Sequence, residues 1–353
     1  MAKIDSLFDK MLAMGASDLH LMEGQRPKIR QHGHLIAIQD EDILQRETME
    51  AYLSEIAGPD RWSHFIKTHD LDFAYAKDET VRYRTNFYYH LYGLGAVFRT
   101  IPSNIASLKD LNLPPVLNTF SKLRSGLVLV TGPTGSGKST TLAAIINEIN
   151  LNLSRYILTI EEPIEFVHIP NQSVFCQREV GVDTHSFAEG LRTSVRQDVD
   201  VILVGEMRDY ETISLALSAA AMGSLVFGTL HTNSAIKTVD RIIDVFPPEQ
   251  QDKARTILSD TLRGVCAQLL LKQADGKGRL AACEILLATQ GLASSIREGN
   301  TSNIRNIMQG GKNNGMQLMD DVIESYLKKG LIHGEEAYYK AFDKGRFLAH
   351  MPK

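Results

Sequence analysis

The feature that most constrains this chain is one run of eight residues with fixed spacing near its middle. It matches G-x-x-x-x-G-K-[ST] at every fixed position and reads Gly132, Pro133, Thr134, Gly135, Ser136, Gly137, Lys138 and Ser139. Such a loop works only between a strand and a helix, because its backbone N–H groups and the helix N-terminus face a phosphate together. The apolar residues 127–130 precede it, and a helical stripe of aliphatic residues follows within 138–149. The run therefore predicts a nucleotide-binding loop inside an α/β unit.

Three polar side chains at the end of this run are candidates for direct ligand contact. Lys138 is expected to reach the β- and γ-phosphates, and the hydroxyl of Ser139 is expected to ligate Mg²⁺. Thr140 completes the predicted nucleotide-binding set. A glycine-rich turn with no ligand would not explain a lysine followed by three hydroxyl residues. We expect Lys138 to face solvent when no ligand is bound.

A nucleotide hydrolase also needs acids that hold Mg²⁺ and orient water. An apolar run closed by an acid brings a carboxylate to a strand tip, and Glu161 and Glu206 each close such a run. Both are predicted to act in catalysis and to hold the metal, whereas Glu162 has either a supporting or a solvent-facing role. His231 follows a further apolar run and is predicted to sense the γ-phosphate. No second His or Cys lies at ligand spacing, so zinc is not expected.

Composition narrows the class of protein. The 353 residues leave room for about two domains. The formal net charge is −4 and no basic run stands out, which argues against a nucleic-acid-binding protein that relies on a basic face. No apolar run is long enough to span a membrane, and the first residues lack the apolar core of a signal peptide. The three cysteines form no C-x-x-C pair, which fits a reducing cytoplasm.

Periodicity predicts the domain organisation. Residues 1–105 are predicted to form a small α+β domain, with a helix at 4–14 and strands at 17–21, 28–38 (a hairpin turning at 32–33), 71–75, 81–89 and 94–101. The prolines after residue 112 place a linker at 106–115. From their local sequence alone, Arg84 and Arg99 are interpreted as solvated arginines on antiparallel strands.

The rest of the chain alternates strand and helix. Apolar runs at 127–131, 156–160, 201–204 and 225–230 predict a mostly parallel sheet with helices on both faces, in a nucleotide-binding core at 116–285. Ligands of such sheets bind beyond the carboxyl ends of the strands. Residues 286–353 are predicted to be the helical C-terminal part of this core, with helices at 290–297, 302–309 and 316–329.

Several longer motifs now point to one family. They are the phosphate loop, Ser17-Asp18-Leu19-His20-Leu21, the acidic segment 159–165, the segment 177–181, the stretch 196–209 that contains Glu206, and the stretch 228–233 that contains His231. In this order they make the chain resemble the secretion ATPases of the type II/type IV pilus superfamily. Residues 295–300 (SIREGN) resemble the C-terminal motif of the branch that retracts pili, differing at the first and last positions.

The resemblance implies an N-terminal PAS-like domain, a RecA-like ATPase domain and a homohexameric ring that uses ATP and Mg²⁺ to retract type IV pili. It implies that Arg84 and Arg99 reach the nucleotide when the domains close, and that Glu206 or Glu161 positions the attacking water. It also implies a cytoplasmic location at the inner membrane and an inner-membrane platform protein of the PilC type as partner, with no nucleic acid and no zinc.

Two departures and four alternatives accompany this resemblance. The acidic segment has Glu161 and Glu162 where the family usually has Asp, and Val199 stands where the family usually has Pro. The alternatives are a PilU-like accessory ATPase, a type II secretion or pilus-extension ATPase, a nucleic-acid translocase and a nucleotide-gated scaffold without turnover. Extension ATPases are expected to carry an extra N-terminal domain and a tetracysteine zinc module, and this sequence shows neither.

Overall fold

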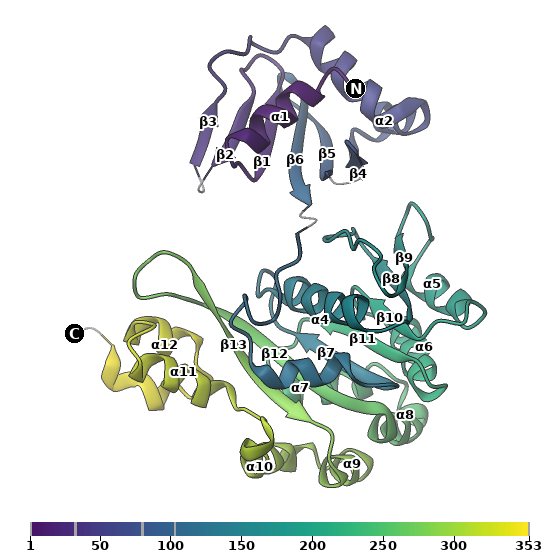
Figure 1. Cartoon of the computed structure of the whole chain (residues 1–353), viewed down its shortest axis with the longest axis vertical. Helices are drawn as coiled ribbons and strands as arrows, with labels where there is room; N and C mark the ends of the chain where they lie inside the picture. The colour runs from purple at the N-terminus through teal and green to yellow at the C-terminus, as the bar shows by residue number, and fades with distance from the viewer. Residues whose placement is uncertain (1, 32–33, 79–80, 102–103, 352–353) are drawn as a thin grey trace. The chain divides into compact units, whose positions relative to one another are not determined.

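The computed structural model describes residues 2–31, 34–78, 81–101 and 104–351, and they form two units that each contain a sheet (Figure 1). Unit 1 comprises residues 1–104 and 163–167, and unit 2 comprises residues 105–162 and 168–353. The segment 163–167 follows Glu162 and groups with unit 1, although the sequence prediction places it in the nucleotide-binding core. Among the described residues, no helix is both long and apolar enough to cross a bilayer.

In the described part of unit 1, six antiparallel strands lie in the order β3-β2-β1-β6-β5-β4. Their bounds are β1 (Asp18–Met22), β2 (Lys28–Gln31), β3 (His34–Ala37), β4 (Asp70–Ala76), β5 (Arg82–His90) and β6 (Gly93–Ile101). The predicted strands are confirmed, and β2 pairs with β3 as a hairpin, but its predicted turn at 32–33 lies outside the described residues. Helix α1 (Asp5–Ala13) is confirmed, and α2 (Arg46–Thr68) has no counterpart in the sequence prediction.

The two faces of this sheet differ. Leu19 and Phe98, which are register partners, are fully buried in the core that contains residues of both α1 and α2. The next row along the strands lies on the opposite face. There Arg84 pairs in register with Arg99, and Arg99 with Asp18. The alternation of side chains along a strand thus separates an apolar face from a charged one.

In the described part of unit 2, seven strands lie in the order β13-β12-β7-β11-β10-β8-β9, and all neighbours except β12 and β13 are parallel. Their bounds are β7 (Gly126–Thr131), β8 (Tyr156–Glu161), β9 (Val174–Glu179), β10 (Val201–Val204), β11 (Leu225–Leu230), β12 (Leu262–Lys272) and β13 (Arg279–Leu287). The mostly parallel sheet and its four predicted strands are confirmed. Strand β12 is missing from the sequence prediction because it starts directly after α8 (Pro248–Thr261), with no turn residues between them.

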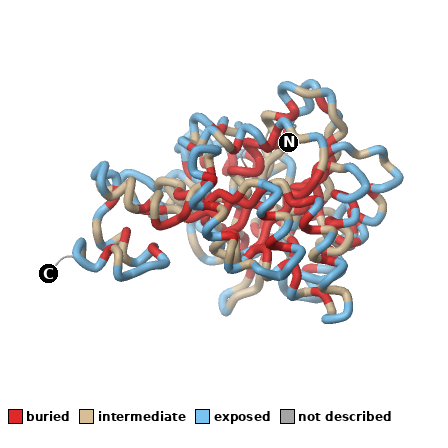
Figure 2. The backbone as a smooth tube through the Cα atoms, turned by 90° about the horizontal axis from the view of Figure 1, so that it is seen from below, coloured by how far each residue is buried: buried red, intermediate tan, exposed pale blue. Residues whose placement is uncertain are grey.

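Helices cover both faces of this sheet, as predicted. Leu127 and Leu129 of β7 are buried in one core cluster, whereas Val128 and Val130 are buried in another with residues of α4 (Lys138–Asn152). The first cluster also contains residues of α5 (Phe187–Ser194), α6 (Tyr210–Ala221), α7 (Ala235–Asp244), α8, α9 (Gln290–Arg297) and α10 (Ile304–Gly310). Figure 2 shows the buried stretches running through the sheet and exposed turns around them.

The C-terminal helices pack on the far ends of β12 and β13. Residues of α11 (Met319–Lys328) and α12 (Gly334–Lys340) form a cluster there with Leu269 and Leu271. Asp320 of α11, only 4% exposed, connects this helix to the residues that follow α12. Its carboxylate accepts hydrogen bonds from the backbone N–H groups of Phe342 (2.8 Å) and Asp343 (3.0 Å). The described helices confirm those predicted at 290–297, 302–309 and 316–329, and α12 is additional.

Replacing Asp320 with Ala should destabilise this C-terminal segment by roughly 2 kcal/mol, because two backbone N–H groups lose a charged acceptor. Hydrogen–deuterium exchange of peptides covering 339–348 should become faster. Asp343→Ala is the matched control, since that side chain is exposed and makes no capping hydrogen bond to the short helix that follows it. Equal exchange in both variants would contradict a structural role for Asp320.

Candidate nucleotide site of unit 2

The order of the parallel strands brings four predicted motifs to one edge of the sheet. The phosphate loop follows β7, His231 follows β11, Glu206 is the second residue after β10, and Glu161 ends β8. These strands are neighbours in the order β7-β11-β10-β8. Parallel strands have their carboxyl ends at the same edge, so all four motifs lie there.

The phosphate loop connects β7 to α4 as predicted, and its side chains differ in burial. Pro133, Thr134 and Gly135 are exposed, Ser139 and Thr140 are half-buried, and Ser136 is buried. Lys138 is only 9% exposed, so the expectation that it faces solvent is wrong. Its ammonium donates to the carbonyl oxygens of Gly132 (2.9 Å) and Pro133 (3.1 Å), which draws the side chain back over the loop.

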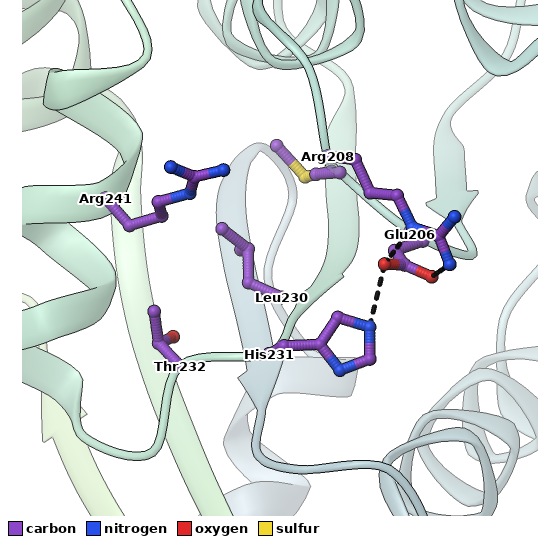
Figure 3. A pocket seen from close by; sticks show the side chains of 7 residues that line it. Glu206, Arg208, Leu230, His231, Thr232 and Arg241 are labelled. Atoms are coloured by element: carbon purple, nitrogen blue, oxygen red, sulfur yellow. Dashed lines mark hydrogen bonds and ion pairs between the residues drawn. The ribbon is translucent and has the colours of Figure 1, made fainter.

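Glu206 lies at the centre of a charged cluster (Figure 3). His231 Nε2 is 2.7 Å from Glu206 Oε1, and a carboxylate only accepts, so Nε2 carries the hydrogen. The Arg208 guanidinium bonds both carboxylate oxygens: Nε pairs with Oε1, and Nη2 donates to Oε2 at 2.7 Å. The strand-end acid and the strand-end histidine, each predicted separately, are therefore in direct contact.

The surroundings of Glu206 pull its pKa in two directions. Partial burial of the carboxylate favours the neutral acid, but the hydrogen bonds and positive charge of Arg208, with a further contribution from His231, outweigh it. The pKa of Glu206 is therefore lower than that of an ordinary glutamate. At neutral pH the site contains a fully ionised carboxylate.

Two cavities flank His231. One, of about 490 Å³, is lined by Glu206, Arg208, His231 and Arg241 among others, and Figure 3 shows Arg241 projecting from α7 on the opposite side from Arg208. The second, of about 510 Å³, is lined by Pro133 of the loop, His231, Asn233, residues 339–342 and Lys344, among others. His231 thus lines two hollows at this edge of the sheet, one of which also borders the phosphate loop.

Glu161 is positioned by its own strand and by β9. Its Oε1 accepts hydrogen bonds from Thr159 Oγ1 (2.7 Å) and Gln177 Nε2 (3.3 Å). Ile160 of β8 is level with Val204 of β10, so Glu161 stands beside Gly205, one residue before Glu206. Glu162 is exposed. Across the described residues, no group of three or more His, Cys, Asp or Glu side chains could by itself hold a metal ion.

The predicted arginines lie in unit 1. Arg84 is exposed, and Arg99 Nε donates to Asp18 Oδ1 at 2.7 Å. Asp18 is buried, which opposes its ionisation, but hydrogen bonds from Ser17 and Arg99 lower its pKa below the ordinary value. A buried ionised partner therefore orients Arg99 on the charged face of the sheet.

Three polar residues around this site have no role in the sequence prediction. Arg208 lies in the stretch 196–209, but nothing in that stretch predicts its contact with Glu206. Arg241 lies on an amphipathic helix, where a surface arginine carries no local signal of function. Gln268 is a polar residue within the apolar strand β12, and that interruption is the one visible signal.

Comparisons with known proteins agree with this geometry. Residues 2–336 match the family described as "Type II/IV secretion system protein". The chain belongs to this family. It is 45% identical over 327 residues to the "Type IV pilus retractation ATPase PilT" of Pseudomonas aeruginosa, covering 93% of this chain and 94% of that protein. It is also 46% identical over 315 residues to the "Twitching motility protein" of Neisseria gonorrhoeae, covering 89% of this chain and 84% of that protein.

Within the secretion ATPase family, this member is of the PilT type. A crystal structure of the pilus retraction motor PilT with bound ADP superimposes with a TM-score of 0.91 at 38% identity and covers 98% of each chain. The PilU ATPase of P. aeruginosa is less similar, at 35% identity over 335 residues, with 95% of this chain and 87% of that protein covered. The predicted fold, a PAS-like domain followed by a RecA-like ATPase domain, is confirmed.

Removing the guanidinium in Arg208→Ala should raise the pKa of Glu206, because burial then opposes ionisation with only His231 left to offset it. The measurement is a ¹³C NMR titration of glutamate side-chain carboxyls, with the Glu206 signal assigned through Glu206→Gln. Arg192→Ala is the control, since Arg192 pairs with the exposed Glu211. An unchanged Glu206 titration in Arg208→Ala would show that Arg208 does not govern this carboxylate.

Proposed function

We propose that this chain is an ATP-hydrolysing motor that retracts type IV pili and drives twitching motility, working as a homohexamer. One observation carries the proposal: the phosphate loop, His231, Glu206 and Glu161 share one edge of the sheet in a chain of the PilT type. The residues at the strand edge are of the types that ATP hydrolysis needs. The proposed roles in pilus retraction and twitching motility are taken from the names of the relatives.

The phosphate loop fits the phosphates of ATP. Helix α4 has no side-chain cap and no acid in its first turn, so its N-terminal N–H groups suit an anion. Ser136 Oγ is buried without a hydrogen-bond partner in the part of the chain that the structure describes. Residues 132–140 would hold the nucleotide, with the Lys138 ammonium transferring from the Gly132 and Pro133 carbonyls to the β- and γ-phosphates.

The donor set also fits Mg²⁺, which prefers oxygen ligands and binds through one or two carboxylates plus phosphate oxygens. Ser139, in the first turn of α4, and Glu206 or Glu161 would provide the protein oxygens. When bound, the ion supplies charge neutralisation at the β- and γ-phosphates. Glu206 or Glu161 then orients and deprotonates the attacking water, and His231 positions Glu206 and senses the γ-phosphate.

Retraction is favoured over extension and over an accessory role. The segment 295–300 that resembles the retraction motif ends α9, where Ile296 is fully buried and Arg297 Nη2 donates to Ser259 Oγ (3.1 Å) and Asp260 Oδ1 (3.0 Å) of α8. The higher identity to PilT than to PilU favours a motor that hydrolyses ATP without a second ATPase. We further propose a cytoplasmic location at the inner membrane, with a platform protein of the PilC type and PilU-like ATPases as partners.

Lys138→Ala tests the proposed function most directly. It should abolish ATP turnover by the purified chain and twitching motility in a complemented deletion strain, because the loop loses the charge that bridges the β- and γ-phosphates. Thermal unfolding is measured alongside, since Lys138 is buried. Lys253→Ala, an exposed lysine of α8, is the control. Parental turnover in Lys138→Ala would disprove the loop assignment, and DNA-stimulated turnover by the parent would favour a translocase.

Glu206→Gln should retain Mg-ATP binding and lose hydrolysis by ~10²-fold or more, because the amide keeps the shape of the side chain but cannot accept a proton. Single-turnover assays and fluorescent-nucleotide titrations separate the two effects. Glu161→Gln is measured in parallel. If Glu161→Gln loses hydrolysis while Glu206→Gln remains active, the roles of the two acids are exchanged.

Arg84→Ala and Arg99→Ala should each lower turnover, because charge supplied at the γ-phosphate is worth ~10³-fold or more. Arg84→Ala should leave the fold intact, since the side chain is exposed. Arg99→Ala also deprives the buried Asp18 of its guanidinium, so Asp18→Asn/Arg99→Ala serves as its stability control. Parental turnover in both single variants would show that Arg84 and Arg99 are surface arginines without a role in hydrolysis.

A further inference from the structure

Gln268 is a buried polar residue in an apolar strand. It lies in the middle of β12 and is only 2% exposed. Both neighbours are buried as well: Ala267 fully, and Leu269 with 8% exposed. A buried amide without partners is costly, so its hydrogen bonds account for its place in the fold. Two of those bonds lead to the phosphate loop and α4, and in a third, longer one the thiol of Cys283 donates to Gln268 Oε1 at 3.9 Å.

The side-chain amide of Gln268 bridges two points that flank Lys138. Nε2 donates to the carbonyl oxygen of Ser136 at 2.7 Å, and Oε1 accepts from the hydroxyl of Thr141 at 2.8 Å. The Ser136 carbonyl can only accept, which fixes the amide with its NH₂ group toward the loop. One side chain of β12 therefore connects the loop to the first turn of α4.

The loop also lies so close to Gln268 that two of its glycines cannot carry a side chain. A Cβ at Gly132 would collide with the backbone carbonyl oxygen of Gln268, and a Cβ at Gly137 would lie 2.8 Å from Gln268 Nε2. Both glycines also have positive φ, 145° and 87°. Both ends of the loop thus rest against one residue of the neighbouring strand.

This contact sets the orientation of a peptide group. In a planar trans peptide, the C=O of Ser136 and the N–H of Gly137 point in opposite directions. Because Gln268 binds the carbonyl, the Gly137 N–H points away from β12. A donor whose direction is fixed before the ligand arrives needs no reorganisation when a phosphate binds.

We propose that Gln268 is a positioning residue that holds the phosphate loop in its anion-binding conformation. The inference rests on the proposed nucleotide-binding function and adds a residue outside the loop motif. Its effect falls equally on the ground state and the transition state, because the loop contacts the phosphates in both. Loss of this support should therefore raise KM and Kd while kcat changes little.

The test measures the Kd for fluorescent ADP, KM, kcat and thermal unfolding of the full chain. Gln268→Met removes the hydrogen bonds to Ser136 and Thr141, and Gln268→Glu keeps the acceptor for Thr141 but loses the donor to Ser136. Each should raise Kd and KM roughly 10-fold, the effect of about 1.4 kcal/mol of lost interaction, with kcat within about 3-fold of the parent. Thr141→Val should give a smaller rise, and Thr141→Ser, which keeps the hydroxyl, should restore the parental values.

Gln317→Met is the matched control. Gln317 Nε2 donates to the carbonyl of Cys283 on β13 at 3.1 Å, so the same chemical change occurs beside the same sheet, at a side chain that has no hydrogen bond to the phosphate loop among the described residues. A merely structural role for Gln268 would lower the folded fraction and hence kcat, leave KM unchanged, and match Gln317→Met. That outcome, or a parental Kd in Gln268→Met, overturns the inference.

Two further outcomes keep the inference separate from the function on which it rests. If the Gln268 variants do not fold, the Thr141→Val and Thr141→Ser pair decides: equal Kd values in both overturn the inference. If the parent itself does not bind fluorescent ADP, the proposed function fails and the inference fails with it. Tight binding by the parent with unchanged binding by the variants overturns the inference alone.

Discussion

The parallel register of four neighbouring strands is the constraint on which the candidate site depends. Leu129, Gly228, Val204 and Ile160 stand in one row across β7, β11, β10 and β8. The residues that follow this row therefore emerge at one edge, where the phosphate loop, His231, Glu206 and Glu161 begin. A slip of one residue in any of these strands would turn its buried side chains to the opposite face, so packing on both faces enforces the register.

Charge balance is the second organising principle of the edge. The pKa of Glu206 is lowered because Arg208 and His231 contact its carboxylate, and the buried Lys138 ammonium donates hydrogen bonds to two loop carbonyls. Glu206 and Lys138, which the proposed chemistry uses, thus already have partners within the chain. In the proposed function, binding of Mg-ATP would exchange these internal partners for metal and phosphate, and so would couple ligand binding to movement of side chains at the strand ends.

The accuracy of the sequence prediction follows the range of the interactions involved. The phosphate loop, four strands of the unit 2 sheet and the strand-end acids could be predicted because each has a local pattern of apolar runs and turn residues. Strand β12 could not, since it continues directly from α8, and neither could the burial of Lys138, which depends on how the loop folds back over its own carbonyls. Gln268 is an extreme case, because Ser136 and Thr141, which its side chain binds, lie more than 120 residues earlier in the chain.

The sequence by itself determined which groups are available: a loop that binds phosphate, acids and a histidine at strand ends, and the family to which their order belongs. These follow from spacing along the chain, and spacing is a local property. Only the tertiary structure decided that His231 contacts Glu206, that Arg208 lowers the pKa of this acid, and that Gln268 supports the loop from a neighbouring strand. The physical reason is that strand order sets the distances between residues remote in sequence, and burial sets how far each group is desolvated. No local sequence pattern encodes either quantity.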